Sequence, residues 1–133
     1  MKIRSITLAC CIVFTSLTAG ANEPKATGFA SWYGEDHRGR LMANGKRFNP
    51  DKLTAASWFY PLGTRVRVTA LEDGPSSKRI KSQPRSVLVT ITDRGPAKTL
   101  VRDGRIIDLG HAAFTQLAHP DLGLVQVSVQ PLK

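Results

Sequence analysis

Asp93 is the residue of this sequence whose type and position are best suited to chemistry. Residues 87–92 alternate between two sets of side chains, which is typical of a strand with one buried face, and Gly95 and Pro96 then end that strand. A carboxylate at a strand end can be held rigidly over a groove, where Arg94 could pair with Asp93 or with a ligand. Alternatively, Asp93 only accepts backbone N–H bonds in its own turn. The stretch alone leaves both interpretations open.

Other side chains could complete a site around this carboxylate. Glu35 and Asp36 could supply a second carboxylate, although a solvated charged loop is the simpler interpretation. His37 lies in the same charged loop and could approach the groove. The three histidines of the chain lack a metal-ligand spacing with one another or with cysteine. We therefore expect neither a metal ion nor a cofactor.

Two groups of aromatic residues could stack on the C–H faces of sugar rings. Tyr33 and Trp32 form one group and residues 58–60, Trp-Phe-Tyr, form the other. Aromatic residues on strands more often belong to the core. Tyr33 is the member that we expect nearest to a ligand.

Residues 1–21 have the form of a secretory signal peptide. Lys2 and Arg4 precede an apolar run over residues 6–17, and small residues occupy 19–21. The run is shorter than the roughly 20 residues of a spanning helix, so we expect cleavage before Asn22 and no membrane span in the mature chain. Both cysteines, Cys10 and Cys11, lie in this segment, so the mature fold needs no disulfide. Acylation of either cysteine would instead make a lipoprotein, although the apolar run before it would be very short.

The mature chain would have 112 of the 133 residues, which is enough for one domain. Loss of Lys2 and Arg4 leaves 17 basic and 10 acidic residues, a formal charge of +7. This balance favours an acidic partner, although it could serve solubility alone. An exported protein meets anionic cell wall and lipid headgroups before nucleic acid, so we expect no nucleic-acid partner. The expected organisation is a signal peptide (1–21), a linker (22–27) and one domain (28–133).

The mature region consists of short extended segments separated by Gly and Pro. Most of these segments alternate in the manner of strands, one is rich in small residues, and the helical composition of residues 111–118 predicts one short helix. The expected strands are 29–33, 53–56, 64–69, 87–92, 105–109 and 124–129. Such a series predicts a mainly β fold, a small closed barrel, because closure removes exposed edges; a sandwich is the alternative. The expected core is Val66, Val68, Val87, Val89, Ile91, Ile106, Leu109, Val125, Val127 and Val129.

Six motifs in series resemble the RlpA family. They are Gly-Phe-Ala-Ser-Trp-Tyr-Gly at 28–34, Ala-Asn-Gly at 43–45, Leu-Thr-Ala-Ala at 53–56, Pro-Leu-Gly-Thr at 61–64, Thr-Asp-Arg-Gly-Pro at 92–96 and Arg-Ile-Ile-Asp-Leu at 105–109. The resemblance implies a six-stranded double-psi β-barrel with one short helix. It also implies an exported periplasmic or cell-envelope protein, a lytic transglycosylase that acts on peptidoglycan strands stripped of their stem peptides.

The resemblance also implies roles for particular residues. Asp93 matches the family's aspartate and would be the acid and base that forms 1,6-anhydro-muramoyl ends. Arg94 would position the ligand, whereas Asp108 and Tyr33 would lie near the groove. We expect a monomer whose partners are glycan strands and cell-envelope or division proteins.

Two positions depart from the family pattern. Lys46 stands where the family usually has a glutamate, and Ser57 stands where it usually has a histidine. Both would line the groove beside Asp93, where Ser57 can form hydrogen bonds but cannot exchange a proton near neutral pH. A second hypothesis therefore stays open, that of a non-catalytic, expansin-like barrel that binds peptidoglycan.

Overall fold

The computed structural model describes residues 25–71 and 85–133. The expected signal peptide and most of the polar loop at 71–85 lie outside the described residues. Within the described ranges, no helix has both the length and the apolar character needed to cross a membrane.

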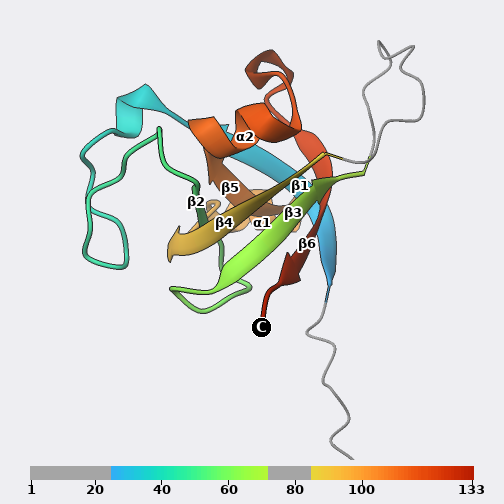
Figure 1. Cartoon of the computed structure of the whole chain (residues 1–133), viewed down its shortest axis with the longest axis horizontal. Coiled ribbons are helices and arrows are strands. Elements are labelled where there is room, and N and C mark those ends of the chain that lie inside the picture. The colour runs from blue at the N-terminus through green and yellow to red at the C-terminus, as the bar shows by residue number, and fades with distance from the viewer. Residues whose placement is uncertain (1–24, 72–84) are drawn as a thin grey trace, which may run out of the picture.

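Six strands form a closed barrel (Figure 1). The strands are β1 (Ala26–Tyr33), β2 (Thr54–Ala56), β3 (Arg65–Ala70), β4 (Ser86–Asp93), β5 (Arg105–Gly110) and β6 (Val125–Pro131). Their order around the barrel is β1-β5-β2-β4-β3-β6. The β1–β5 and β2–β4 pairs are parallel, and the other four pairs are antiparallel. The closed order confirms the predicted barrel and excludes the sandwich.

The barrel interior is filled by the alternating side chains of the strands. In β3, Val66 and Val68 are fully buried while Arg65 and Arg67 are exposed. All ten residues expected in the core are buried. The helix α2 (His111–Leu117) lies over the barrel (Figure 1), and its Phe114, one of the apolar residues expected to pack from this helix, is fully buried in the core.

The structure adds short helical segments to the one helix that the sequence predicts. Helix α1 (Lys98–Arg102) lies in the segment 97–104, which we expected to be a loop. It is a single turn that buries no residue, so it has no apolar periodicity from which it could have been predicted. The 3-10 turns η1 (Glu35–His37) and η2 (Pro120–Leu122) are equally short.

Strand β1 begins at Ala26, within the segment expected to be a linker. Residues 26–30 pair with β6, whereas residues 29–33 pair with β5. The first residues of the strand thus complete the closure of the barrel on the β6 side.

Candidate active site

Asp93 and Asp108 lie on the two strands that flank β2 and pair with the same residue of it. Asp93 at the end of β4 is opposite Ala56, and Asp108 on β5 is opposite Ala56 from the other side. Residues paired directly across strands point to the same face of a sheet, and two strand spacings separate their α-carbons by about 10 Å. The small side chain of Ala56 leaves space between the two carboxylates.

A break in strand register turns Asp93 toward this face. Simple alternation would place Asp93 on the interior face with Val89 and Ile91. The β2–β4 register skips Thr92, so that Ile91 and Thr92 are both buried and Asp93 points outward. Bulges commonly re-aim a side chain next to a site in this way.

The Asp93 carboxylate is held by the backbone on one oxygen. Its Oδ1 accepts hydrogen bonds from the backbone N–H of Ala43 at 2.9 Å and of Arg94 at 2.8 Å. No hydrogen bond to Oδ2 is found within residues 25–71 and 85–133. Asp93 therefore does accept the local backbone bond expected of a turn residue, and it also lines a cavity.

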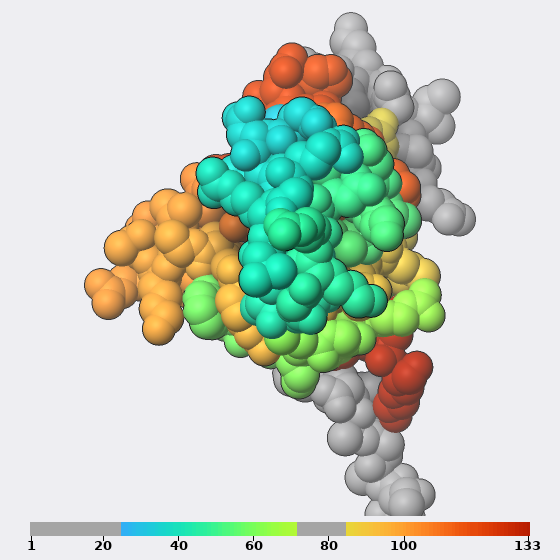
Figure 2. Space-filling view, turned by 90° about the vertical axis from the view of Figure 1, so that its left-hand side faces the viewer, coloured from blue at the N-terminus to red at the C-terminus, as the bar shows by residue number. Residues whose placement is uncertain are grey.

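This cavity, which we call the acid cavity, has a volume of about 270 Å³. Its polar lining residues are Asp93, Asp108, Tyr33, His37, Arg40 and Arg94. Figure 2 shows segment 35–53, in cyan and teal, as a ridge across the face of the molecule, with the orange α1 segment projecting beside it. The structure thus brings together four residues that the sequence nominated: Asp93, Asp108, Arg94 and Tyr33.

Asp108 is the carboxyl group of the cavity with the clearest electrostatic perturbation. Burial raises the pKa of Asp108 above its ordinary value, while a hydrogen bond from Ser31 and the charges of Arg105 and His37 oppose the rise. The Ser31 Oγ donates this bond to Asp108 Oδ1 from the neighbouring position on β1. A carboxyl group in such surroundings keeps its proton to a higher pH than an exposed one.

Tyr33 lines the acid cavity together with the two carboxylates. Its ring stacks on Phe48 with a centroid distance of 4.2 Å. Burial raises the pKa of Tyr33, and the negative charges of Asp93 and Asp108 raise it further, whereas Thr54 lowers it. The Tyr33 hydroxyl has no partner of hydrogen-bond geometry in the described part of the chain, and neither does the Thr54 hydroxyl. Tyr33 therefore keeps a neutral phenol, whose hydroxyl is buried beside Thr54 and closed off from solvent.

His37 also lines the acid cavity, in agreement with the possibility that it approaches the groove. Its ring meets the Tyr33 ring edge-on at 5.7 Å, and its Nδ1 is buried without a hydrogen-bond partner among the described residues. His37 lines both the acid cavity and a neighbouring cavity of about 460 Å³, which contains Glu35 and Asp36. In the sequence, the feature that pointed to His37 was its position in the charged loop after Gly34.

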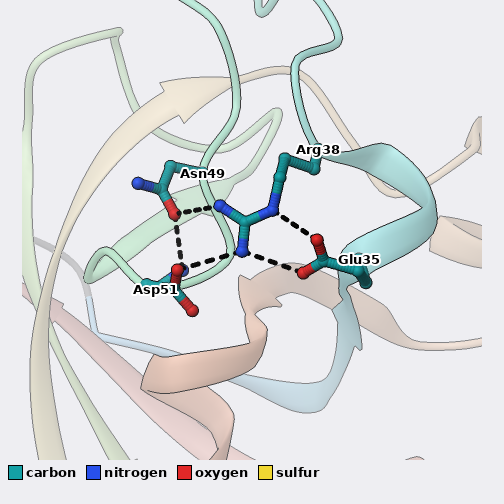
Figure 3. A network of polar contacts seen from close by, with 4 residues as sticks. All are labelled: Glu35, Arg38, Asn49 and Asp51. Atoms are coloured by element: carbon teal, nitrogen blue, oxygen red, sulfur yellow. Dashed lines mark hydrogen bonds and ion pairs between the residues drawn. The ribbon is translucent and has the colours of Figure 1, made fainter.

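A four-residue network holds the loop that carries His37 (Figure 3). Arg38 pairs with Glu35 and, at 2.9 Å, with Asp51, and its Nη1 donates to Asn49 Oδ1 at 3.2 Å. The hydrogen bond from Arg38 is the main cause of a lowered pKa at Glu35. Glu35 is thus tied to Arg38, outside the lining of the acid cavity, and the second carboxylate of that cavity is Asp108.

Arg94 is directed at the backbone of the segment after β2. Its Nη1 donates to the carbonyl oxygens of Ser57 at 2.8 Å and Tyr60 at 2.6 Å. Trp58, between these residues, donates from Nε1 to the Pro96 carbonyl at 2.7 Å. Arg94 and Trp58 therefore fix the 57–60 segment against the turn that follows Asp93.

Ser57 and Lys46 lie away from the groove position that we expected for them. Ser57 is 0% exposed, and its Oγ donates to the Ile106 carbonyl at 3.0 Å and accepts from the backbone N–H of Phe59 at 3.2 Å. The two hydrogen bonds draw the small hydroxyl into the barrel wall. Lys46 is exposed and lines a separate cavity on the other side of the 42–44 segment.

The described residues contain no cluster of side chains that could bind a metal ion. No three His, Cys, Asp or Glu side chains there lie close enough together to hold an ion. The donor set of the acid cavity consists of two carboxyl groups, a phenol and an imidazole, which suits proton transfer to a polar ligand.

The barrel belongs to a class with known structures. It matches the Streptomyces papain inhibitor with a TM-score of 0.58 at 23% identity, over 83% of this chain and 96% of the inhibitor. It also matches the apo expansin of Clavibacter michiganensis with a TM-score of 0.57 at 18% identity, over 83% of this chain and 51% of the expansin. These likenesses confirm the fold, that of a double-psi β-barrel.

Sequence comparison then gives the family. Residues 25–129 match the family described as lytic transglycolase, and the chain belongs to this RlpA-like family. It is 42% identical to the probable endolytic peptidoglycan transglycosylase RlpA of Synechocystis, over 77% of this chain and 27% of that protein. It is 36% identical to the endolytic peptidoglycan transglycosylase RlpA of Pseudomonas aeruginosa, over 80% of this chain and 27% of that protein. The chain thus spans about a quarter of the length of these two relatives.

A shorter relative matches over nearly its whole length. This uncharacterised protein of Synechocystis is 40% identical over 77% of this chain and 94% of the relative.

Proposed function

We propose that this protein is an endolytic peptidoglycan lytic transglycosylase that acts on glycan strands without stem peptides. The observation that carries the proposal is the acid cavity, in which Asp93 and Asp108 face one space from the two sides of Ala56. Family membership and the names of the relatives support peptidoglycan as the substrate.

Asp93 is proposed as the acid and base of the reaction. In its protonated form it gives a proton to the oxygen that links N-acetylmuramic acid to N-acetylglucosamine, and the bond between this oxygen and the anomeric carbon breaks. The muramoyl 6-hydroxyl then bonds to the anomeric carbon, and its proton returns to Asp93. The products are a free N-acetylglucosamine 4-hydroxyl and a 1,6-anhydro-muramoyl end, and no water is consumed. Because two N–H groups hold Oδ1, Oδ2 is the atom assigned to proton exchange.

Asp108 and Tyr33 are proposed to bind the sugar beside the bond that is cleaved. While it is protonated, Asp108 can donate a hydrogen bond to an acetamido or hydroxyl oxygen, and its raised pKa preserves this form to a higher pH than in an exposed carboxyl group. Tyr33 lines the same cavity and supplies aromatic surface there. Arg94 is proposed to position the substrate through the turn and the 57–60 segment that it fixes.

Trp58 provides a platform at the rim of the cavity. Trp58 is 46% exposed, and its indole is held by the hydrogen bond to the carbonyl of Pro96, which lines the acid cavity. The Lys98 Nζ lies 5.3 Å from the ring centroid. A fixed, half-exposed indole suits stacking on the C–H face of a sugar.

The proposed location of the protein is the periplasm or cell envelope, which it would reach after export and cleavage of residues 1–21. Envelope or division proteins are proposed as further partners.

A second candidate is a non-catalytic barrel that binds peptidoglycan. The residues at the two positions that depart from the family pattern do not line the acid cavity, because Ser57 is buried and Lys46 lines the other cavity. This observation favours the binding candidate. In this case Asp93 and Asp108 would form hydrogen bonds to sugar hydroxyls without proton transfer.

Digestion of purified naked glycan strands separates the two candidates. The enzyme hypothesis requires 1,6-anhydro-muramoyl ends by mass spectrometry with the native protein, and their loss by at least about 100-fold with Asp93→Asn. Asp121→Asn, at an exposed site on η2, is the matched control and should leave the ends unchanged. Retention of the protein on the strands without new ends would support the binding hypothesis and reject the enzyme.

A further inference from the structure

A separate cavity is lined by cationic side chains and has no carboxylate in its lining. It has a volume of about 790 Å³, and the three charged side chains that line it are Lys46, Arg47 and Lys52. Its other polar lining residues are Asn44, Asn49, Thr54, Thr90 and Thr92. We call it the cationic cavity.

The cationic cavity shares a wall with the acid cavity. Met42 lines both spaces. Ala43 lines the cationic cavity and donates its backbone N–H to Asp93 Oδ1, and Thr92 lines the same cavity one residue before Asp93. A polymer seated over Asp93 would therefore reach the cationic cavity by crossing residues 42–44.

The cations are presented by a fixed segment of backbone. The Lys46 N–H donates to Asn44 Oδ1 at 3.0 Å, and the Lys46 carbonyl accepts from the Met42 N–H at 2.8 Å. The adjacent residue, Arg47, bridges to Leu41 across the turn and donates to the Gly39 carbonyl at 2.8 Å. Within the described ranges, no carboxylate forms an ion pair with Lys46, Arg47 or Lys52. The backbone that carries Lys46 and Arg47 is thus fixed, and the cations of this cavity have no partner carboxylate among the described residues.

We infer that the cationic cavity is a subsite for a carboxylate carried by the sugar chain, namely the lactyl carboxylate of a muramoyl residue next to the one cleaved at Asp93. The inference rests on the proposed function, since it needs a glycan strand in the acid cavity. A stem peptide converts the lactyl carboxylate to an amide and removes its charge. The subsite therefore favours naked strands by attraction of their carboxylates, in a cavity where the lysines supply donors and point charges.

The test measures binding, so that it does not depend on turnover. Glycan strands with free lactyl carboxylates are compared with the same strands after the carboxylates are converted to amides, in an Asp93→Asn background that prevents cleavage. Lys46→Gln and Lys52→Gln remove charges from the cavity, and Arg67→Gln removes the same charge from an exposed site on β3 outside the lining. These positions are exposed, and equal melting temperatures would show that the variants fold.

The subsite predicts tighter binding of the carboxylate form at low salt. Each lysine substitution should weaken this binding by about twofold to fivefold and leave binding of the amide form unchanged. Arg67→Gln should retain the preference, and high salt should abolish it. Equal binding of both strands, or a preference that survives the double lysine variant, would overturn the subsite and leave the proposed function standing. Binding of neither strand would overturn both.

Discussion

Asp93 and Asp108 face the same cavity from two strands that are not neighbours in the barrel, because β2 lies between them and both residues pair with its Ala56. Fourteen residues of chain, which include α1, connect the two positions. The barrel order, and not proximity in sequence, therefore creates the pair. The two carboxyl groups also differ in surroundings, since backbone N–H groups hold Asp93 whereas Asp108 is buried beside Ser31.

Asp108→Asn should increase stability while it reduces activity. Because burial raises the folded pKa of Asp108 above the ordinary 3.8, the folded state binds more protons than the unfolded state between these two values. Stability therefore falls as pH rises through this window, and at neutral pH the ionised group costs stability. The amide keeps an acceptor for Ser31 without the charge. We expect a higher melting temperature at pH 7 than for the native protein, a difference that shrinks below pH 3.8, and weaker release of anhydro ends. A lower melting temperature at pH 7 would contradict this account of Asp108.

The sequence predicted the barrel wherever alternation reflects burial. Val66 and Val68, and Val87, Val89 and Ile91, alternate because one face of each strand fills the interior. It predicted Asp93 as a site residue from its place at a strand end.

The rest depended on pairing between distant segments. The outward turn of Asp93 depends on a register skip opposite β2, and the pairing of Asp108 with Ser31 joins residues 77 positions apart. Nothing local marks Ser57 as buried, because the carbonyl that it bonds belongs to Ile106 on another strand. Burial and register of this kind are properties of the folded barrel and leave no trace in local residue patterns.

Tyr33→Phe should change neither stability nor affinity by much. The hydroxyl is buried and makes no hydrogen bond of good geometry among the described residues, so its removal should change the free energy of unfolding by less than about 0.5 kcal/mol. The ring stays stacked on Phe48, so affinity for naked strands should change by less than about twofold. Titration of strands against both proteins, with parallel denaturation curves, checks both numbers. A large loss of stability would show that the hydroxyl bonds within the fold, and a large loss of affinity would show that it reaches the sugar.

Ser57→His should not restore the family's histidine to the groove. The site is 0% exposed and filled, so a larger ring must displace the barrel wall, at a cost of about 1–3 kcal/mol. Ser57→Ala should cost a similar amount, because the Phe59 N–H loses its acceptor. Thermal denaturation of both variants is the measurement, with Thr99→Ala at an exposed position of α1 as the control. A stable Ser57→His protein with raised activity would show that the position opens to the groove.

Arg94→Lys should loosen the 57–60 segment despite retention of the charge. The Ser57 and Tyr60 carbonyls both accept from the single nitrogen Nη1, and a lysine ammonium, on a shorter side chain and strongly hydrated, cannot hold the same position. We expect a loss of about 1–2 kcal/mol in the free energy of unfolding and a change in the fluorescence of Trp58, which lies in the same segment. Arg102→Lys, on the exposed face of α1, should show neither effect.

His37→Gln should shift the pH dependence of activity through Asp108. The positive charge of His37 is one of the influences that lower the pKa of Asp108, so its removal raises that pKa further. If protonated Asp108 binds the substrate, the range of pH over which strands are cleaved should extend upward in the variant. The Arg38 network should still hold the loop, because its bonds come from Glu35, Asn49 and Asp51. Rates of anhydro-end formation across pH 5–9 provide the measurement, with the exposed His119→Gln as the control. A downward shift of the pH profile, or the same profile in the native protein and both variants, would show that His37 does not influence activity through Asp108.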